Sequence, residues 1–295
     1  MHQNASRGFA LGALGVTIFA LTLPMTRLAV GDTSDPQLPP LFVTAGRAAL
    51  AGVLSAAYLL ALRALRPQRQ HWRALFVCAL GTVLGFPLFL ALALRQVDAM
   101  HAAVVTGVLP LGTAVVAALV LRQRASAGFW ACALLGCALV VLFAALAGGG
   151  ALSAADGLLL LAVLSASVGY VAGAQVSAQL GAERTICWVL VLSLPLTLPA
   201  MLLTWPAQPA RLSAWLGFGY VTLFSMWLGF FAWYRGLALG GVMRVSQVQL
   251  LQPFLALVFA VPILGERLEF DTVAFALAVM AVVLVGKRMP VATPR

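Results

Sequence analysis

The sequence predicts an all-α, polytopic membrane protein of ten transmembrane helices, arranged as two inverted five-helix repeats. The chain has 295 residues, of which 63% are hydrophobic and 9% charged, and its mean hydropathy is +1.03. A water-soluble fold cannot bury so much apolar surface. The apolar residues also form runs of about 20, the length that crosses a bilayer as a helix. Finally, residues 98–143 match residues 241–286 after a shift of 143, which pairs Pro110 with Pro253.

Ten apolar spans follow one another along the chain with short connections. In order, they lie at roughly 8–30, 40–62, 73–94, 99–121, 127–147, 155–179, 186–204, 212–235, 242–264 and 271–288. The run Gly148-Gly149-Gly150 separates the fifth span from the sixth. We therefore expect a first five-helix repeat over residues 1–147, a second over 155–288 and a cytoplasmic tail over 289–295.

The distribution of charge predicts the orientation of the spans. Thirteen of the 18 Lys and Arg residues flank one set of span ends, and every acidic residue except Glu183 lies on the opposite side. The positive-inside rule places the basic side, with both termini, in the cytoplasm. The repeated hairpin agrees, since its first loop (122–124) is basic and its second (266–271) is net acidic. Five spans per repeat make the second repeat start on the opposite side, so the repeats are inverted.

The composition excludes several classes of function. The formal charge of +10 comes from residues that flank spans, and no basic stripe with interleaved aromatics indicates nucleic-acid binding. The chain has one Lys, Lys287, and no phosphate-binding Gly-rich loop, which excludes ATP hydrolysis. Its three His residues form no cluster with acids, and its four Cys residues have no metal-site spacing. We expect no enzyme, no cofactor and no metal, only a small-molecule substrate and the lipid bilayer as partners.

The fourth and ninth spans carry the best candidates for a substrate site. A proline inside a span frees a backbone carbonyl, and two interrupted helices at matching positions indicate a midplane site. Polar residues accompany both prolines at helical spacing. The substrate-binding candidates here are Thr106 and Pro110 in the fourth span, and Ser246, Gln249, Gln252 and Pro253 in the ninth. The alternative is that these residues only kink helices and bond neighbouring ones.

The sixth and eighth spans add three further candidates. Tyr170 and Gln175 lie in the sixth span. Trp227 is the central member of an aromatic series in the eighth span, whose steps of 4, 3, 4 and 3 place it on one helix face. We expect Tyr170 and Trp227 to contact the side chain of the substrate. The alternative for the aromatic face is a lipid-facing stripe with interfacial anchors.

Three charged residues are candidates for a gate or for a structural role. Arg47 lies about eight residues into the second span, where a charge is costly. It could anchor a substrate carboxylate or contact an outer acid such as Asp98, although a structural tie to helix-end carbonyls is favoured. Glu266 follows the ninth span, in the acidic loop. No carboxylate lies at mid-depth, so we expect facilitated or weakly coupled export and not tight proton antiport.

The chain resembles the EamA branch of the drug/metabolite transporter superfamily. The resemblance rests on Arg47, on the Pro110 span, and above all on Leu250-Leu251-Gln252-Pro253 followed by Leu264-Gly265-Glu266-Arg267-Leu268. It covers residues 8–288, but the first repeat has Arg122-Gln123 where Gly-Glu is usual. That departure suggests that Glu266 is a turn or topology residue. The resemblance implies ten helices, a bacterial inner (plasma) membrane and a central substrate cavity.

Within that family the chain looks most like bacterial exporters of aromatic or neutral amino acids of the YddG-like type. Small multidrug exporters of cations use a membrane-embedded Glu in the first span, which residues 8–30 lack. We therefore expect a secondary transporter that exports amino acids by alternating access, as a monomer or alternatively a homodimer. The alternatives are an exporter of another metabolite or drug, such as a purine or a nucleotide sugar, a channel-like facilitator, or a membrane scaffold.

Overall fold

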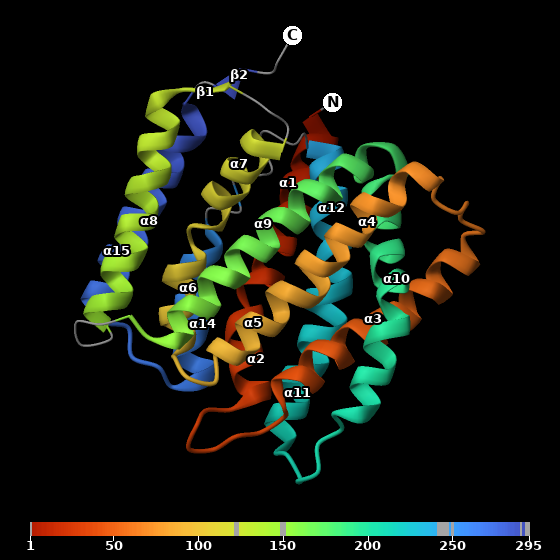
Figure 1. Cartoon of the computed structure of the whole chain (residues 1–295), viewed down its shortest axis with the longest axis horizontal. Helices are drawn as coiled ribbons and strands as arrows, with labels where there is room; N and C mark the ends of the chain where they lie inside the picture. The colour runs from red at the N-terminus through yellow and green to blue at the C-terminus, as the bar shows by residue number, and fades with distance from the viewer. Residues whose placement is uncertain are drawn as a thin grey trace.

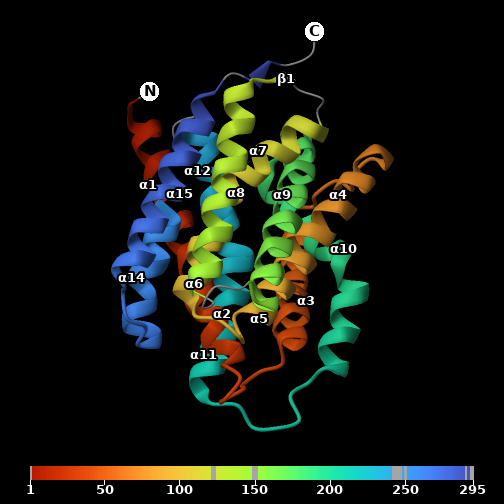
Figure 2. The same cartoon turned by 60° about the vertical axis from the view of Figure 1, so that its left-hand side comes forward.

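The computed structural model describes residues 2–120, 124–147, 152–240, 248, 251–289 and 291–292. These residues form a bundle of long helices, shown from two directions in Figure 1 and Figure 2. Eight helical segments are long and apolar enough to cross a membrane, and two further apolar segments, Gln252–Leu264 and Phe270–Gly286, are shorter. A multi-pass helical membrane protein is therefore confirmed. The ninth predicted span is described only at residue 248 and from residue 251 onward.

The first half of the chain contains five of these crossings. Its helices are α1 (His2–Ala20), α2 (Thr22–Val30), α3 (Pro40–Ala61), the 3-10 turn η1 (Arg69–His71), α4 (Trp72–Cys78), the π-helical η2 (Ala79–Gly85), α5 (Phe86–Ala93), α6 (Ala99–Thr106), α7 (Leu109–Val120) and α8 (Ala127–Ala147). Three predicted spans are thus made of more than one helical segment. The breaks lie at Leu21, at η2 and at Gly107-Val108.

The second half repeats this order with fewer described breaks. Its helices are α9 (Ala154–Leu180), α10 (Ala182–Leu203), α11 (Leu212–Tyr220), the π-helical η3 (Val221–Leu228), α12 (Gly229–Gly240), α14 (Gln252–Leu264) and α15 (Phe270–Arg288). Helix α10 begins at Ala182, four residues before the predicted start of the seventh span at residue 186. The left-handed φ of +81° at Gly181 turns the chain at once from α9 into α10, a conformation that glycine adopts without steric cost.

Two short strands depart from the all-α prediction. β1 (Arg124–Ala125) and β2 (Val291–Ala292) pair antiparallel, with Arg124 opposite Ala292 and Ala125 opposite Val291. The segment 289–295 was expected to be a cytoplasmic tail. Its described residues 291–292 pair with the backbone just before α8, because two extended segments at the same end of the bundle satisfy each other's hydrogen bonds.

Small residues bring η2 unusually close to α9. A Cβ added to Gly81 would lie 2.3 Å from the Ser165 carbonyl oxygen and 2.8 Å from the Cα of Gly169. Only glycine allows such an approach, which is typical of helix packing in membranes. Thr82 of η2 thus lies against Gly169 of α9, the residue that precedes Tyr170.

Helices from the two halves pack in pairs across the molecule. α1 packs along α12, α3 along α10, and α8 along α15, and the last pair is plain in both views (Figures 1 and 2). Helix α1 begins at the end of the bundle where α15 ends, and the α2–α3 and α10–α11 connections lie at the opposite end (Figure 1). This arrangement agrees with the even number of crossings predicted from the sequence. Which end faces the cytoplasm stays a prediction from charge.

Candidate functional site

A helix break and a helix start lie beside the two prolines from which an interruption was predicted, at Pro110 and at Pro253 respectively. Helix α6 ends at Thr106 and α7 begins at Leu109, so Pro110 lies in the first turn of α7. Helix α14 begins at Gln252, with Pro253 in its first turn. Proline is tolerated at these positions because the first amides of a helix have no partner within it. These helix ends bring backbone and polar side chains together inside the bundle.

Two π-helical segments lie at matching places in the two halves. η2 (Ala79–Gly85) and η3 (Val221–Leu228) carry Thr82 and Ser225, which the shift of 143 also pairs. A π-helix widens each turn and disturbs the regular backbone ladder, and such segments are frequent at functional sites. From the sequence, regular α-helix is expected here. The pairing of the intramembrane hydroxyls of Thr82 and Ser225 was the available signal.

These helix ends and π-segments surround a cavity of about 60 Å³, which we call the central cavity. Its size suits a few water molecules. It is lined by Phe19, Thr22, Leu23, Arg47, Thr82, Phe86, Pro87, Leu90, Thr106, Leu109, Tyr170, Ser225, Met226, Phe230 and Gln252. Both halves of the chain contribute, and the lining combines hydroxyls, an amide and a guanidinium with aromatic rings.

Arg47 is the one charged residue among these lining residues, and only 3% of it is exposed. Its Nη2 donates a hydrogen bond to the Ser225 Oγ at 3.0 Å. Its Nε is buried and has no hydrogen-bond partner among the described residues. Ser225 in turn shares a 2.8 Å hydrogen bond with Thr22. The favoured expectation for Arg47 was a tie to helix-end carbonyls, and the one contact recorded for it is instead to a hydroxyl facing the cavity.

The structure brings three of the predicted substrate-binding residues, Thr106, Tyr170 and Gln252, to the central cavity. A smaller adjoining pocket of about 30 Å³ is lined in part by Thr106, Pro110, Gln252 and Pro253. These predicted residues therefore share one region at these helix ends. Ser246 and Gln249 lie outside the described residues.

Two predicted residues do not lie at the cavity. Gln175 is exposed on the outer surface of α9. Trp227 packs with its ring centroid 5.1 Å from Phe231 and 6.4 Å from Tyr58 of α3. Trp227 lies away from the cavity because it belongs to the π-helix η3. The wider turn of a π-helix rotates its side chains away from the positions they would have in an α-helix. Ser225 and Met226 of η3 line the cavity in its place.

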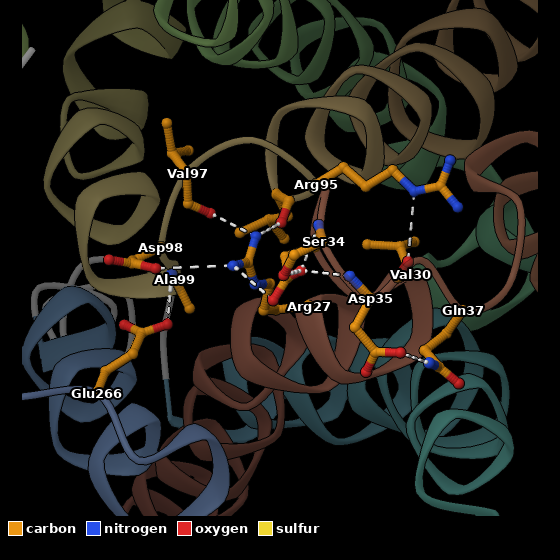
Figure 3. Close-up of polar contacts among 12 residues, drawn as sticks. Arg27, Val30, Ser34, Asp35, Gln37, Arg95, Val97, Asp98, Ala99 and Glu266 are labelled. Carbon is orange, nitrogen blue, oxygen red and sulfur yellow. Dashed lines mark hydrogen bonds and ion pairs between the residues drawn. The ribbon is translucent and has the colours of Figure 1, made fainter. Parts of the chain in front are cut away.

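Arg27 lies at the end of the bundle that the charge distribution predicts to face outside. Its Nη1 donates to the carbonyl oxygens of Leu94 and Val97, the latter at 3.1 Å. Its Nη2 lies 3.8 Å from an Asp32 oxygen and 3.7 Å from an Asp98 oxygen. We call Arg27, Asp32, Asp98 and Glu266 the outer charge cluster (Figure 3). It ties α2 to the loop before α6.

Glu266 links the second half of the chain to α6 (Figure 3). Its two carboxylate oxygens accept hydrogen bonds from the backbone amides of Ala99 and Met100, at 2.7 and 2.8 Å. Burial raises the pKa of this carboxyl, although the two amides act in the opposite direction. Amides at a helix N-terminus favour a negative charge. Glu266 was expected to be a turn or topology residue, and it forms a contact between distant parts of the chain as well.

Helix α6 connects the outer charge cluster to the central cavity. Its first residue, Ala99, binds Glu266, and its last residue, Thr106, lines the cavity. Eight residues of α-helix span about 12 Å. His101 on this helix also bonds Asp156 of α9, with an Nε2–Oδ1 distance of 2.6 Å. The described residues contain no group of three or more His, Cys, Asp or Glu side chains that could hold a metal ion.

Comparisons with known proteins agree on the kind of molecule. The model of the EamA-like transporter family matches residues 6–145 and again residues 153–286. An uncharacterized transporter, YdeK of Bacillus subtilis (strain 168), is 43% identical over 288 residues, which cover 97% of this chain and 99% of that protein. A solved crystal structure of a protein is 21% identical, with a TM-score of 0.62 and 96% coverage of both chains. At that identity the likeness supports the fold alone.

Proposed function

Because the chain belongs to the EamA-like transporter family, we propose that it is a secondary transporter that exports amino acids from the cytoplasm across the bacterial inner membrane. Its substrate would bind in the central cavity and cross by alternating access. Family membership makes the chain a membrane transporter. The substrate, the direction of transport and the membrane are our proposal.

The observation that carries this proposal is the buried guanidinium of Arg47 at the central cavity, with its Nε unpaired among the described residues. A carboxylate would satisfy it through charge-assisted hydrogen bonds. The hydroxyls of Thr22, Thr82 and Thr106 and the amide of Gln252 line the same cavity and would accept hydrogen bonds from an amino group. The cavity of about 60 Å³ would have to widen to admit a substrate, and its apolar lining would then receive the side chain.

We further propose that the two halves are inverted five-helix repeats that move relative to each other. The paired prolines, the paired π-segments and the two matches to one family model support this arrangement. In this mechanism the outer charge cluster closes the outer side of the cavity. Glu266 would hold α6 to the α14–α15 loop, and its release would let α6 hinge at Gly107.

The test of the proposal is counterflow in proteoliposomes across the twenty amino acids, purines and nucleotide sugars. We expect saturable counterflow of amino acids, which a channel-like facilitator would not show. Replacing Gln252 by Ala should lower the rate, because this amide lines the cavity. The matched control is Gln175→Ala on the exposed surface of α9, which should transport normally. Counterflow of purines or nucleotide sugars alone would favour the alternative substrates.

The proposed gate has its own test. In a variant that lacks the four native cysteines, Thr106→Cys should react slowly with a membrane-impermeant thiol reagent added outside. Adding Glu266→Ala should accelerate this labelling at least about threefold, because α6 loses both amide contacts. Arg211→Gln at the same end serves as the control. Equal labelling with and without Glu266 would remove this residue from the gate.

A further inference from the structure

We propose that the central cavity recognises amphipathic monocarboxylates, that is, solutes with one carboxylate and an apolar or aromatic body, and that it does not require their amino group. Aromatic acids without an amino group should therefore bind about as well as the corresponding amino acids. This inference rests on the proposed function for the location of the site, and it goes further in naming which groups of the substrate are recognised.

The first step is the unpaired charge of Arg47. Its guanidinium has five N–H donors, and a hydroxyl, Ser225 Oγ, is the one acceptor recorded for it in the described part of the chain. A charge buried without a counter-ion costs several kcal/mol in a low-dielectric interior. A carboxylate that enters the cavity would supply the missing charge and accept two parallel hydrogen bonds.

The second step concerns the amino group, for which the cavity offers no negative partner. The structure describes all eight acidic residues of the chain, and none is among the lining residues. The undescribed stretches 241–247 and 249–250 contain no Asp or Glu in their sequence. An ammonium group would find only uncharged partners on this lining, namely hydroxyl and amide oxygens, which roughly replace the water it leaves, and aromatic faces, and it would lie near the cationic guanidinium of Arg47. We therefore expect it to add little affinity.

The third step concerns the negative charge of the solute, which the single cation of the described lining limits to one. Arg47 is the single cation on the described lining. A monocarboxylate bound there leaves the site neutral, whereas a diphosphate would leave a net negative charge buried in the bundle. Such an uncompensated charge is strongly unfavourable. Nucleotide sugars should therefore be poor ligands.

The fourth step is the apolar part of the lining, which suits a hydrophobic body. Phe19, Phe86, Met226 and Phe230 face the cavity, and the rings of Phe19 and Phe230 meet edge to face at a centroid distance of 5.1 Å. Aromatic ligands gain affinity from such surroundings through offset and edge-to-face contacts. The cavity thus pairs one cationic end with an aromatic region.

The experiment measures binding to the purified full chain in detergent, by thermal stabilisation, and needs no transport. The probes are phenylalanine, 3-phenylpropanoate (the same carbon skeleton without the amino group), phenethylamine (the amine without the carboxylate) and UDP-glucose. We expect 3-phenylpropanoate to bind within about threefold of phenylalanine, and phenethylamine at least about tenfold more weakly, since it lacks the charge-assisted pair. UDP-glucose should not stabilise the protein.

Variants of Arg47 assign the carboxylate to its guanidinium. Arg47→Gln should abolish the stabilisation by 3-phenylpropanoate, and Arg47→Lys should retain it with about tenfold weaker binding, because an ammonium lacks the planar fork. Gln175→Ala is the matched control. Phenethylamine binding as well as 3-phenylpropanoate, or UDP-glucose stabilising the protein, would overturn the inference.

The outcomes separate this inference from the proposed function. If phenylalanine binds and shows counterflow while 3-phenylpropanoate does not bind, the inference fails and amino-acid export stands. If 3-phenylpropanoate binds and no amino acid shows counterflow, the inference stands and amino-acid export fails. Identical binding by wild type and Arg47→Gln would exclude Arg47 as the anchor.

Discussion

Arg27 and Arg47 both lie within predicted spans, yet the two guanidinium groups differ in how many hydrogen-bond acceptors surround them. Arg27 is surrounded by acceptors, namely two carbonyl oxygens and the carboxylates of Asp32 and Asp98. Arg47 makes a single recorded hydrogen bond, to Ser225, and is more deeply buried. An arginine whose donors are satisfied holds the structure together, whereas one whose donors are not satisfied is available to a ligand. Substitutions of these arginines, and of charged residues at the outer end of the bundle, test this contrast.

The largest effect on stability should come from Arg27→Leu. This change leaves the carbonyl oxygens of Leu94 and Val97 without their donor and removes both ion pairs. We expect the free energy of unfolding to fall by about 2 kcal/mol, mostly from the unsatisfied carbonyls, because Asp98 is too exposed for a strong ion pair. Thermal unfolding of the wild type and the variant in detergent measures this change in the free energy of unfolding. A variant as stable as the wild type would show that Arg27 has no structural role.

Arg47→Leu should shift stability in the opposite direction. It removes a buried charge, and Ser225 keeps its hydrogen bond to Thr22. We expect the free energy of unfolding to rise by about 1 kcal/mol, with loss of ligand binding. The same unfolding experiment checks it. Destabilisation equal to that of Arg27→Leu would mean that Arg47, too, is a structural residue.

A smaller effect should appear in the pH dependence of stability. Because burial raises the pKa of Glu266, its charged form opposes folding. Stability should therefore rise as the pH falls through this raised pKa towards the usual value of 4.5. Comparing thermal unfolding of wild type and Glu266→Gln between pH 7 and pH 5 measures this slope, which the variant should lose.

The pH dependence of stability that Asp32 contributes has the opposite sign, and it falls in a lower pH range. Hydrogen bonds from the Ser34 hydroxyl and the Asp35 amide lower its pKa below 3.8, so its contribution is lost only as the pH falls below that value. A wild type that loses stability between pH 7 and pH 5, relative to Glu266→Gln, would contradict the sign expected for Glu266. The central cavity, which has no carboxylate on its described lining, should contribute nothing to this slope.

The smallest effect should come from Arg211→Gln. The Nη1 of Arg211 lies 2.7 Å from the Oδ2 of Asp35, but the two side chains are 69% and 45% exposed, respectively. Exposed ion pairs contribute little because water and salt screen them. We expect a change in the free energy of unfolding below about 0.5 kcal/mol, measured beside Arg27→Leu. A loss as large as that of Arg27→Leu would show that burial does not separate the two arginines.

Much of the fold and part of the site could be predicted from the sequence. The apolar runs predicted the helical spans, and Pro110 lies beside the described break between α6 and α7, where Thr106 and Gln252 line the same pocket. Gln175 and Trp227 were placed by helical periodicity alone. That argument does not distinguish the inner from the outer surface of α9, and it fails where a π-helix changes the register of η3.

The sequence by itself determined that the chain is a helical membrane protein and that the fourth span breaks beside Pro110. Hydropathy and a missing proline amide are properties of each segment, so they need no knowledge of its neighbours. The tertiary structure decided that the hydrogen-bond donors of Arg27 find acceptors and that the Nε of Arg47 does not, among the described residues. Arg47 meets Ser225 across 178 residues, and Glu266 meets Ala99 across 167. Such partners follow only from how the helices pack, because no local pattern specifies them.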